Sequence, residues 1–452
     1  MRYDVAIVGG GFSGSLVAAH LARHGGPDLS VCMFEPSELG RGAAYGTRHR
    51  DHLLNTRASA MSAFPDEPDH FVRWIGARAK PDDFVSRTLY GDYVAEIAHR
   101  AFEHPYFAIV PERVVAAELA GSGGFLVTTA SGQWFSAETL VLATGNPAPN
   151  DDFLPRGLLD HPGYVADPWR TDYRRVAGDV LLIGSGLTAL DVLVALEASG
   201  HRGSVHVVSR HGRFPEVHAD GLAPCDAVPV LDATDARSLV RSFRRQVRDA
   251  AERGVDWRVV VDAIRPEGET LWKRLSAAER RRFDRHLRTK WERHRHRAPQ
   301  QADAARRRYR QSGRLFVRAG RIIGFAGGSV KVEPAAGAPL RLRPDWIVNC
   351  TGPGRSRRLL ADPLLAGLLQ NGIASPEQLG YGIGVDGDLG VVGADGRSVR
   401  GLWVSGPLAR GARFEATAVP ELRVMAQLVA AKALAALDDI PEASASGTVA
   451  HA

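Results

Sequence analysis

The chain alternates between two apolar patterns, short continuous runs that are typical of buried strands and longer stretches with helical spacing. The first run, residues 5–8, is rich in β-branched side chains and stops at a glycine. Apolar residues at helical spacing follow at once over residues 12–21. The same order of strand, glycine turn and helix returns at residues 179–191. Because such alternation is typical of parallel sheets covered by helices, we expect an α/β fold.

The first glycine turn has the spacing of a dinucleotide-binding fingerprint. Gly9, Gly11 and Gly14 occupy the G-x-G-x-x-G positions between the strand and the helix. These glycines permit a tight turn, the approach of a pyrophosphate and the close packing of helix on strand. Some distance on, a second apolar strand at residues 29–34 ends at Glu35, the acid expected to bind a ribose. Together these features predict a Rossmann-like domain whose helix N-terminus holds the phosphates.

The second glycine turn predicts a second Rossmann-like domain with its own coenzyme preference. Gly184, Gly186 and Ala189 fill the three fingerprint positions, and alanine is an allowed variant at the third. The following strand, residues 204–208, leads to Arg210 and not to an acid. Because a guanidinium binds phosphate in a bidentate way and a carboxylate repels it, this strand end favours NADPH over NADH. The alternative is that Arg210 is one of many surface arginines.

The rest of the chain fits around these two turns. An arginine-rich helical region at about 224–312 predicts an insertion in the second domain. Further strands are expected at 113–119, 124–129, 139–147, 315–320, 329–333, 346–353 and 401–405, and helices at 69–75, 90–97 and 420–436. We expect the helices at 69–75 and 90–97 to lie on the rim and the glycine-rich loop at 36–46 to run back over the first cofactor. The apolar, non-periodic segments at 52–56 and 61–65 are expected to face a flavin ring. The small polar tail at 441–452 is expected to be disordered.

Composition narrows the class of protein. The 452 residues carry a formal charge of +6, with 44% hydrophobic and 24% charged residues, which is ordinary for a globular protein. Arginine greatly outnumbers lysine throughout, so we interpret the basic surplus as a solvated surface with sites for anionic cofactors, and expect no nucleic-acid or membrane partner. No apolar stretch could span a bilayer, and a cytoplasmic protein is expected. Cys32, Cys225 and Cys350 are scattered, and neither a redox pair nor a metal site is predicted.

Longer motifs give the chain a specific resemblance. They are GGGFSG, LGRGAAYG, HLLN, MSAFPDEPDHF, LIGSGLTALD, VHVVSR, NCTGP and SGPLARGARFEATAVPELR. With these segments the chain, to about residue 438, resembles a bacterial family of FAD/NAD(P)-binding proteins related to flavin-dependent amino-acid N-hydroxylases and class B flavin monooxygenases. The resemblance implies FAD in a first domain at 1–170 and 346–440 and NADPH in a second at 171–345. It also implies that the helix at 420–436 points its N-terminus at the flavin.

Candidate cofactor contacts follow from the two fingerprints and this resemblance. For FAD they are Gly9, Gly11, Phe12, Ser13, Gly14, Glu35, Pro36, Arg41, Gly42, Tyr45, Leu54, Asn55, Met61, Val115, Ala143, Thr144, Gly145, Gly406, Pro407 and Val419. For NADPH they are Gly184, Ser185, Gly186, Leu187, Thr188, Ser209, Arg210 and Arg213. Many flavoproteins carry Gly-Asp at the end of the last FAD strand, whereas this chain has Gly406-Pro407, so that contact is expected from the backbone. No catalytic side chain is identified.

Two classes of function compete. In an oxygenase, NADPH reduces FAD, O₂ adds at the flavin C4a position, and the resulting peroxide oxygenates a small polar substrate, with N-hydroxylation of an amino acid or amine favoured. In a reductase, electrons leave for a disulfide, a quinone or a protein. A disulfide reductase needs two nearby cysteines, and the sequence offers no such pair. An FAD-binding sensor without activity is a third interpretation.

Two further hypotheses concern particular residues. Arg293, Arg295 and Arg297 in the helical insertion would hold a small acidic substrate if they face the mouth between the domains, and would be a soluble surface if they face outward. The segment Phe153…Gly157…His161…Trp169 resembles a Baeyer–Villiger-type signature with different spacing, and the alternative is a plain linker.

Overall fold

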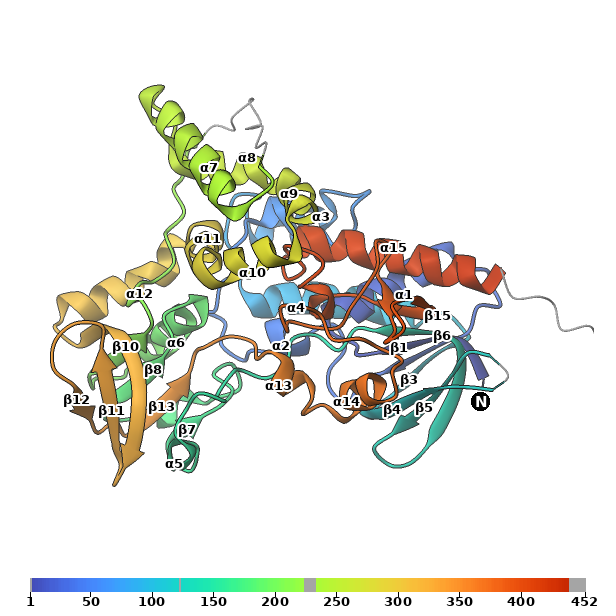
Figure 1. Cartoon of the computed structure of the whole chain (residues 1–452), viewed down its shortest axis with the longest axis horizontal. Helices are drawn as coiled ribbons and strands as arrows, with labels where there is room; N and C mark the ends of the chain where they lie inside the picture. The colour runs from blue at the N-terminus through green and yellow to red at the C-terminus, as the bar shows by residue number, and fades with distance from the viewer. Residues whose placement is uncertain (1, 122, 223–232, 439–452) are drawn as a thin grey trace, which may run out of the picture.

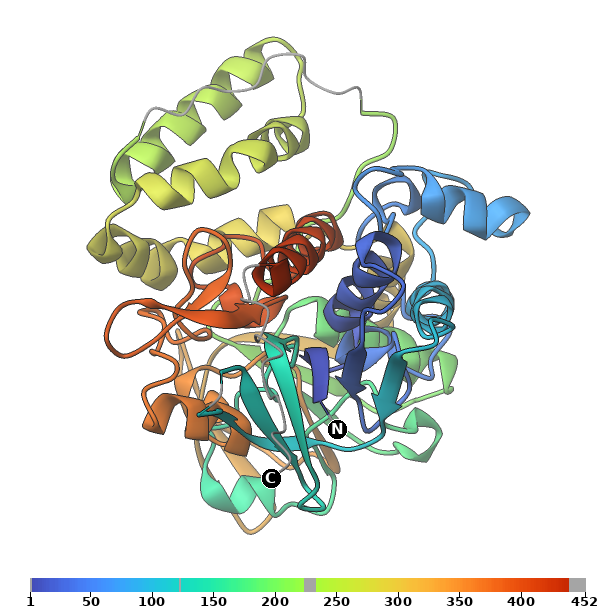
Figure 2. The ribbon, with the colours of Figure 1, turned by 90° about the vertical axis from the view of Figure 1, so that its right-hand side faces the viewer.

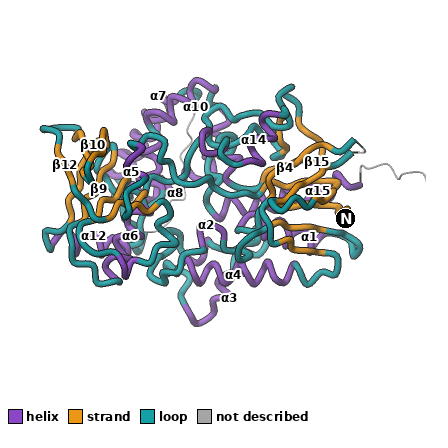
Figure 3. Tube along the Cα trace, turned by 90° about the horizontal axis from the view of Figure 1, so that it is seen from below, coloured by secondary structure: helices purple, strands orange, loops and turns teal. Residues whose placement is uncertain are grey.

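The strands of the molecule lie in two separate sheets. The computed structural model describes residues 2–121, 123–222 and 233–438, so the predictions for Cys225 and for the tail at 441–452 lie outside the described residues. Figure 1 and, from below, Figure 3 show one sheet toward each end of the molecule, with helices between and above them. The expected α/β class with two Rossmann-like units is confirmed.

The first sheet has a parallel core and an antiparallel extension. It contains β1 (Arg2–Val8), β2 (Val31–Phe34), β3 (Phe107–Val110), β4 (Val114–Leu119), β5 (Phe125–Thr129), β6 (Trp134–Leu142), β14 (Gly390–Val392) and β15 (Ser398–Val404). Its described order is β14-β15-β6-β1-β2-β3. β1 is parallel to β2 and β6, while β5 pairs antiparallel with β6 and β4. The strands expected at 113–119 and 124–129 are therefore present as β4 and β5.

Helices surround the first sheet. They are α1 (Phe12–His24), α2 (Gly42–Tyr45), α3 (His70–Ile75), α4 (Arg87–Ala101), α13 (Ser356–Leu359), α14 (Pro363–Gln370) and α15 (Val419–Asp438). α4 begins at the cap Ser86, whose hydroxyl accepts a hydrogen bond from Leu89 N. α1 packs against both α4 and α15. Tyr90 and Tyr93 of α4 are fully buried, so this helix belongs to the core and not to the rim, where it was expected.

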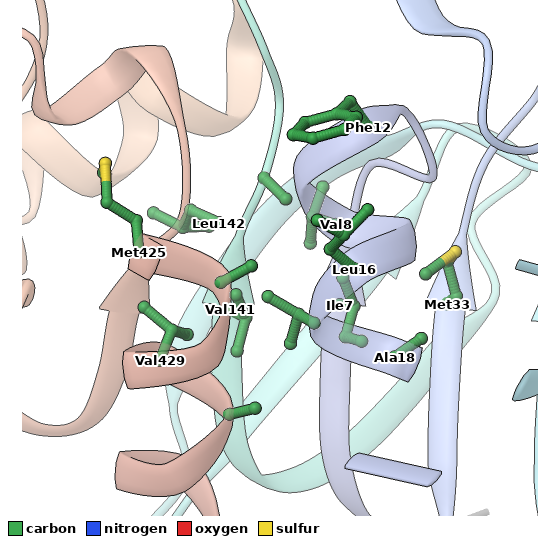
Figure 4. Packing of buried hydrophobic residues seen from close by; sticks show 14 of the residues in the cluster. Ile7, Val8, Phe12, Leu16, Ala18, Met33, Val141, Leu142, Met425 and Val429 are labelled. Carbon is green, nitrogen blue, oxygen red and sulfur yellow. The ribbon is translucent and has the colours of Figure 1, made fainter. Parts of the chain in front are cut away.

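The core of the first half is continuous from helix to sheet to helix. Ile7 of β1 and Val141 of β6 are fully buried in the middle of the sheet. Figure 4 shows Leu16 of α1 and Val429 of α15 packed against these strands. Burial of such apolar surface contributes about 25 cal/mol per Å² to stability. The core therefore fixes where the strands end, and the glycine turn after β1 lies at that edge.

The second sheet repeats the parallel core and adds a meander at its edge. It contains β7 (Tyr164–Val165), β8 (Val180–Ile183), β9 (Val205–Ser209), β10 (Leu315–Ala326), β11 (Ser329–Pro334), β12 (Leu340–Leu342) and β13 (Trp346–Asn349). β7, β13, β8, β9 and β10 are parallel in that spatial order, and β11 and β12 follow antiparallel. The helix after β8 is α6 (Leu187–Ala198), as the second fingerprint predicted.

The limits of this second unit differ from those predicted at residues 170 and 345. β7 lies before the first limit and β13 after the second, yet both pair within the second sheet. The chain crosses between the sheets where Pro149 and Pro353 form an isolated antiparallel bridge. β7 is too short to give an apolar pattern, so the sequence predicts no strand there. The Thr-Gly that follows β13 resembles the end of β6, so the pattern places β13 in the first domain.

A helical insertion separates β9 from β10. Its helices are α7 (Ala236–Glu252), α8 (Trp257–Ile264), α9 (Gly268–Arg274), α10 (Ala277–His286), α11 (Arg288–Arg295) and α12 (Gln300–Gln311). A short helix, α5 (Arg156–Leu159), lies outside the insertion, before β7. α12 returns to the second sheet and packs on α6 and β10. Figure 2 shows the green and yellow helices of the insertion grouped beside α15, away from the strands. Within the described ranges, no helix is long and apolar enough to cross a membrane.

Candidate functional site

The first glycine turn is shaped by two close approaches of backbone. Gly9 has φ +102°, and a Cβ there would lie 2.5 Å from the Ala143 carbonyl oxygen. A Cβ on Gly14 would lie 1.8 Å from the Gly9 carbonyl oxygen, so helix and strand meet as the fingerprint requires. α1 begins after Gly11 with no side-chain cap. Its first N–H groups are therefore available, which suits a dinucleotide phosphate.

The loop after β2 lies over this turn, and its contact with a cofactor stays a prediction. Gly40 N donates to the Gly10 carbonyl oxygen at 2.7 Å. A Cβ on Gly11 would lie 3.3 Å from the Cα of Gly42. A phosphate bound at the first turn would therefore be enclosed between the turn and the loop.

Two candidate side chains of this loop turn into the protein. Tyr45 is buried, and its ring centroid lies 6.0 Å from that of Phe12. The Arg41 guanidinium pairs with Asp92 at 2.6 Å and with Glu38 at 2.7 Å. Because carboxylates already engage Arg41, its contact with FAD stays a prediction.

Glu35 is held at the end of β2 beside the turn. Its Oε2 accepts from Gly10 N at 2.8 Å. Its Oε1 accepts from Ser37 N at 2.9 Å and from Ser37 Oγ at 2.5 Å. These bonds fix the carboxylate where the fingerprint expects an adenosine ribose, and the ribose contact itself stays a prediction.

The ends of β6 and β15 bring other FAD candidates to the same edge of the sheet. Thr144 lies against Gly9, within 3.3 Å of a Cβ placed there. A Cβ on Gly406 would lie 2.7 Å from Ser13 Oγ, which places the end of β15 against the first turn of α1. A cavity of about 300 Å³ opens beside Thr144 and Gly145. Ligands of open α/β sheets bind at such carboxyl ends of strands.

Three other FAD candidates lie on different elements. Pro36 is exposed in the loop after β2, Val115 lies in β4, and Val419 begins α15.

The second glycine turn has the same backbone shape in a more open setting. Gly184 has φ +109°, and a Cβ there would lie 2.4 Å from the Cys350 carbonyl oxygen. Gly186 is exposed, and a Cβ on it would have no described atom within 4 Å. α6 starts after Gly186 with no side-chain cap, so the N–H groups near Leu187 and Thr188 are also available. This arrangement suits a second dinucleotide phosphate.

The end of β9 supplies the basic groups expected beside this turn. Ser185 Oγ lies 2.8 Å from Ser209 Oγ and donates to the Arg213 carbonyl oxygen at 2.8 Å. Arg210 and Arg213 are exposed, and Arg210 Nη2 donates only weakly to Thr289 Oγ1 at 3.3 Å. Among the described residues, no carboxylate pairs with Arg210 or Arg213, so both guanidinium groups can meet an anion.

The loop at residues 47–57, named the seam loop here, joins the first domain to the second at four points. It carries the FAD candidates Leu54 and Asn55, and Tyr90 of α4 donates to the nearby Met61 carbonyl oxygen at 2.9 Å. The four contacts are His49 Nε2 with Thr171 O at 3.0 Å, His52 Nε2 with Asp191 O at 3.0 Å, Asn55 O with His218 Nε2 at 3.0 Å, and Arg57 Nη2 with Asp220 Oδ1 at 2.8 Å. The segment expected to face the flavin is thus positioned by the second domain.

Sequence reasoning missed the polar residues of this seam. His52 is buried and His218 is partly buried, and desolvation lowers the pKa of His52 to about 3 and that of His218 to about 4. Burial raises the pKa of Asp191, and the Arg87 guanidinium opposes this shift. One signal was present in the sequence, because Asp191 interrupts an otherwise apolar helix at a position that faces the core.

Aromatic side chains fix the insertion to the loop that precedes α15. The Phe414 ring lies 5.1 Å from Trp272, 5.7 Å from Phe283 and 5.9 Å from Trp291, measured between centroids. Trp272 Nε1 donates to the Gly411 carbonyl oxygen at 2.9 Å. This packing buries apolar surface from two units that are distant in sequence.

Ion pairs reinforce the same junction. Arg265 forms two hydrogen bonds with Glu421, both of 2.7 Å. Arg295 pairs with Glu415 at 2.9 Å, and both side chains are 9% exposed. Buried pairs of this kind resist separation because each partner would be left desolvated and unpaired. We call the contacts of the insertion with residues 411–421 the clamp.

The hypothesis of free arginines at a substrate mouth is wrong in its simple form. Arg295 belongs to the clamp, and Arg293 pairs with Glu216. Arg297 is buried and binds both carboxylate oxygens of Asp262, at 2.8 and 2.6 Å. Each guanidinium is already neutralised, so these residues do not form an open site for a carboxylate substrate.

A cavity of about 520 Å³ nevertheless opens where the insertion meets the seam loop. Its lining is mostly polar and of mixed charge. It includes Arg57, Asp82, Phe84, His218, Asp262 and Arg297. Because His218 also touches Asn55, this cavity adjoins the segment predicted to face the flavin.

The segment considered for a Baeyer–Villiger-type signature contributes to the second domain. Phe153 is exposed, and His161 Nδ1 accepts from Gly163 N at 3.1 Å just before β7. Trp169 Nε1 lies 3.5 Å from Asp191 Oδ2. The segment is therefore more than a linker, although its side chains do not converge on one point.

Comparisons with known proteins agree with this geometry. Residues 6–147 match the model of a family described as FAD-NAD(P)-binding, and no curated protein sequence matches the chain. Among solved structures, the ornithine hydroxylase of Pseudomonas aeruginosa is 16% identical with a TM-score of 0.61, over 97% of this chain and 100% of that one.

Two other similar structures show that the fold serves different activities. The ornithine N-hydroxylase of Kutzneria sp. 744 is 18% identical with a TM-score of 0.58, over 96% of this chain and 99% of that one. The bacillithiol disulfide reductase of Bacillus cereus is 14% identical with a TM-score of 0.56, over the same shares. The chain thus has an FAD/NAD(P)-binding domain and the fold of flavin-dependent oxidoreductases, a fold that monooxygenases and reductases share.

Proposed function

We propose that the protein is an FAD-dependent, NADPH-consuming monooxygenase that hydroxylates the amine nitrogen of a small polar substrate. The observation that carries this proposal is the fixed seam between the two dinucleotide units. The seam loop and the clamp hold the units together from two sides. Such an arrangement favours chemistry that is completed in one enclosed place.

The backbone around each turn fits the cofactor proposed for it. Gly9, Gly11 and Gly14 leave room and free N–H groups for the FAD pyrophosphate, with Glu35 at the ribose. Gly186 and the start of α6 do the same for NADPH. When bound, NADPH supplies a hydride and FAD supplies the activation of O₂. The protein's own task is then to bind, orient and exclude water.

Arg210 is proposed to select NADPH over NADH. The coenzyme's additional phosphate would meet an exposed guanidinium that no described carboxylate neutralises. A charge-assisted hydrogen bond contributes about 1.5–3 kcal/mol, which corresponds to roughly tenfold or more in affinity.

The two described cysteines argue for the oxygenase over a disulfide reductase. Cys32 lies in β2 and Cys350 directly follows β13, and both are buried and free. Burial raises the pKa of the Cys32 thiol to about 12, and it also raises that of Cys350. A thiol that attacks a disulfide must be exposed and partly ionised, so neither of these suits that role.

The cavity beside the seam loop supports a small polar substrate. Its acidic and basic side chains are largely paired with one another, as Arg57 is with Asp220 and Arg297 with Asp262. A lining of this kind offers hydrogen bonds to a polar molecule but no unpaired guanidinium to a carboxylate. Two of the similar structures are ornithine hydroxylases, which is consistent with an amine substrate.

The test measures whether the electrons of NADPH and the oxygen of O₂ end in a hydroxylated product or in released peroxide. Purified holoprotein would be given NADPH and a panel of amino acids and polyamines, with NADPH loss, peroxide release and hydroxylamine formation measured together. We expect one amine to raise NADPH consumption while peroxide release falls and hydroxylamine appears. Coupling with neutral ketones alone would favour a Baeyer–Villiger oxygenase, and reduction of a disulfide or quinone without oxygen insertion would establish a reductase.

A further inference from the structure

We infer that His52 and Asp191 couple the second dinucleotide site to the segment expected to face the flavin, with His52 as a positioning residue. The inference rests on the two cofactor sites of the proposed function and concerns how one site affects the other. It does not depend on whether the reduced flavin then serves an oxygenase or a reductase.

The hydrogen bonds of His52 define one protonation state. The side chain is completely buried, with Nε2 3.0 Å from the Asp191 carbonyl oxygen and Nδ1 2.9 Å from Thr47 Oγ1. A carbonyl oxygen can only accept, so Nε2 carries the hydrogen. Nδ1 then accepts from the Thr47 hydroxyl. The ring is neutral and its orientation is fixed at both ends.

Arg87 makes the link between the domains double. Its backbone N donates to the His52 carbonyl oxygen at 2.8 Å, and its Nη2 lies 3.6 Å from Asp191 Oδ2. The Arg87 and Asp191 side chains are 12% and 6% exposed. The ring of His49, 4.9 Å from that of His52, and the indole of Trp169 also face this cluster. The Tyr173 phenol and the Cys350 thiol lie near Asp191 as well. Asp191 is therefore held by both its backbone and its carboxylate.

The position of this cluster makes it a short path between the two sites. Asp191 lies one helical turn beyond Leu187 and Thr188, which are expected at the NADPH phosphates. His52 precedes Leu54 and Asn55 in the seam loop. A movement of α6 on coenzyme binding would thus reach the flavin-facing segment through the buried hydrogen bond of His52 to Asp191 and the Arg87 contacts beside it.

A purely space-filling role does not explain this choice of residue. A buried imidazole loses its hydration, and only its two hydrogen bonds offset that loss. An apolar side chain of the same size would pack without this cost. The imidazole instead ties the seam loop to one carbonyl of α6.

The experiment compares two substitutions of equal polarity and different reach. His52→Gln keeps an N–H near the position of Nε2, whereas His52→Asn places its amide near Nδ1 and loses the bond to Asp191. FAD-loaded variants would be titrated with NADP⁺ while the visible flavin spectrum is recorded. The rate of flavin reduction by NADPH would be measured without oxygen.

We expect His52→Asn to lower the limiting rate of flavin reduction about tenfold and to diminish the NADP⁺-induced spectral change, with flavin content and NADPH affinity within about twofold of wild type. His52→Gln should restore both signals to near wild type. Wild-type behaviour of His52→Asn, or equal losses in both variants, would overturn the inference.

One further variant and one further measurement test the inference if the first comparison fails. If His52→Asn fails to hold FAD, Thr47→Val removes only the hydroxyl that orients the ring and should give an intermediate loss, and wild-type signals there would overturn the inference. If wild-type flavin is not reduced by NADPH, the proposed function fails. The spectral response to NADP⁺ still tests the link in that case, because it needs no turnover.

Discussion

The two glycine turns share one scaffold and differ in what surrounds it. In each, the first glycine has a positive φ, and its missing Cβ makes room for a carbonyl of the neighbouring strand end. The second glycine differs, because Gly11 lies against Gly42 of a covering loop whereas Gly186 is exposed with no described atom near its Cβ position. The fingerprint therefore fixes the phosphate cradle, and the following loop decides how open that cradle is.

We expect this difference to give the two nucleotides different lifetimes on the protein. A dinucleotide under the loop of Gly40 and Gly42 can leave only if that loop opens. A dinucleotide at Gly186 is bound on one side and open on the other. We expect the first to stay through many turnovers and the second to exchange at each one, as an oxidoreductase with a resident flavin requires.

The largest effect on stability is expected at the third fingerprint position, which is Gly14 in the first turn and Ala189 in the second. Gly14→Ala would place a Cβ 1.8 Å from the Gly9 carbonyl oxygen and should cost about 3 kcal/mol or more in the free energy of unfolding. Ala189, its counterpart, is already buried with its Cβ, and Ala189→Gly should cost only about 1 kcal/mol. Denaturant unfolding of both variants measures this contrast. Similar losses in both would mean that the turns are packed alike.

The second prediction uses the covered and the open glycine. Gly11→Val should give protein with little or no FAD, because the side chain fills the space between the turn and Gly42. Gly186→Val has space for its side chain and should fold and stay yellow, while its apparent affinity for NADPH falls at least about tenfold. Flavin content and NADPH titration report the two effects. A fully yellow Gly11→Val would contradict the assignment of the FAD site.

The third prediction concerns how acid lowers the free energy of unfolding through the two histidines that join the domains. His52 and His218 have pKa values of about 3 and about 4 in the folded protein, below the 6.5 of a free histidine. The unfolded chain therefore binds more protons below pH 6.5. Stability should be full above pH 6.5 and fall steadily toward pH 4. Denaturant unfolding at pH 7.5 and pH 5 measures the loss, and the variant with both histidines changed to Gln should show a flatter dependence.

The smallest effect is expected at the coenzyme's additional phosphate. Arg210→Ala should raise the KM for NADPH by roughly tenfold and leave that for NADH nearly unchanged. The exposed neighbour Arg202 offers a matched control, because it carries the same charge before the strand begins. Steady-state flavin reduction with both coenzymes reports the change. Equal losses with NADPH and NADH would place Arg210 elsewhere in the mechanism.

Local patterns predicted the parts of the fold that obey local rules. The strand, turn and helix at Gly9 and Gly184 combine glycine geometry with apolar periodicity, and both appear where expected. Domain limits were less well predicted, because β7 has two residues and β13 ends like β6. Strand pairing across more than a hundred residues leaves no local mark in a single sequence.

The ion pairs of the insertion could not be predicted for a related reason. Arg293 and Arg297 resemble surface arginines in the sequence, and only the fold brings Glu216 and Asp262 to them. The clamp likewise depends on Phe414 meeting Trp272 from a different unit. Contacts between elements distant in sequence are set by the packing of whole units, so composition showed a basic surface where the structure has paired charges.

The paired crossing at Pro149 and Pro353 has a consequence for how such a chain can be rebuilt. The second dinucleotide unit begins and ends at one place, so it can be cut out or replaced without opening the first sheet. Replacing that unit alone would remove the partners of two residues of the first domain, Trp272 for Phe414 and Arg295 for Glu415. Exchange of the coenzyme module between relatives therefore has to carry both the seam loop and the loop before α15 with it. The chain is modular in its backbone but not in its side chains.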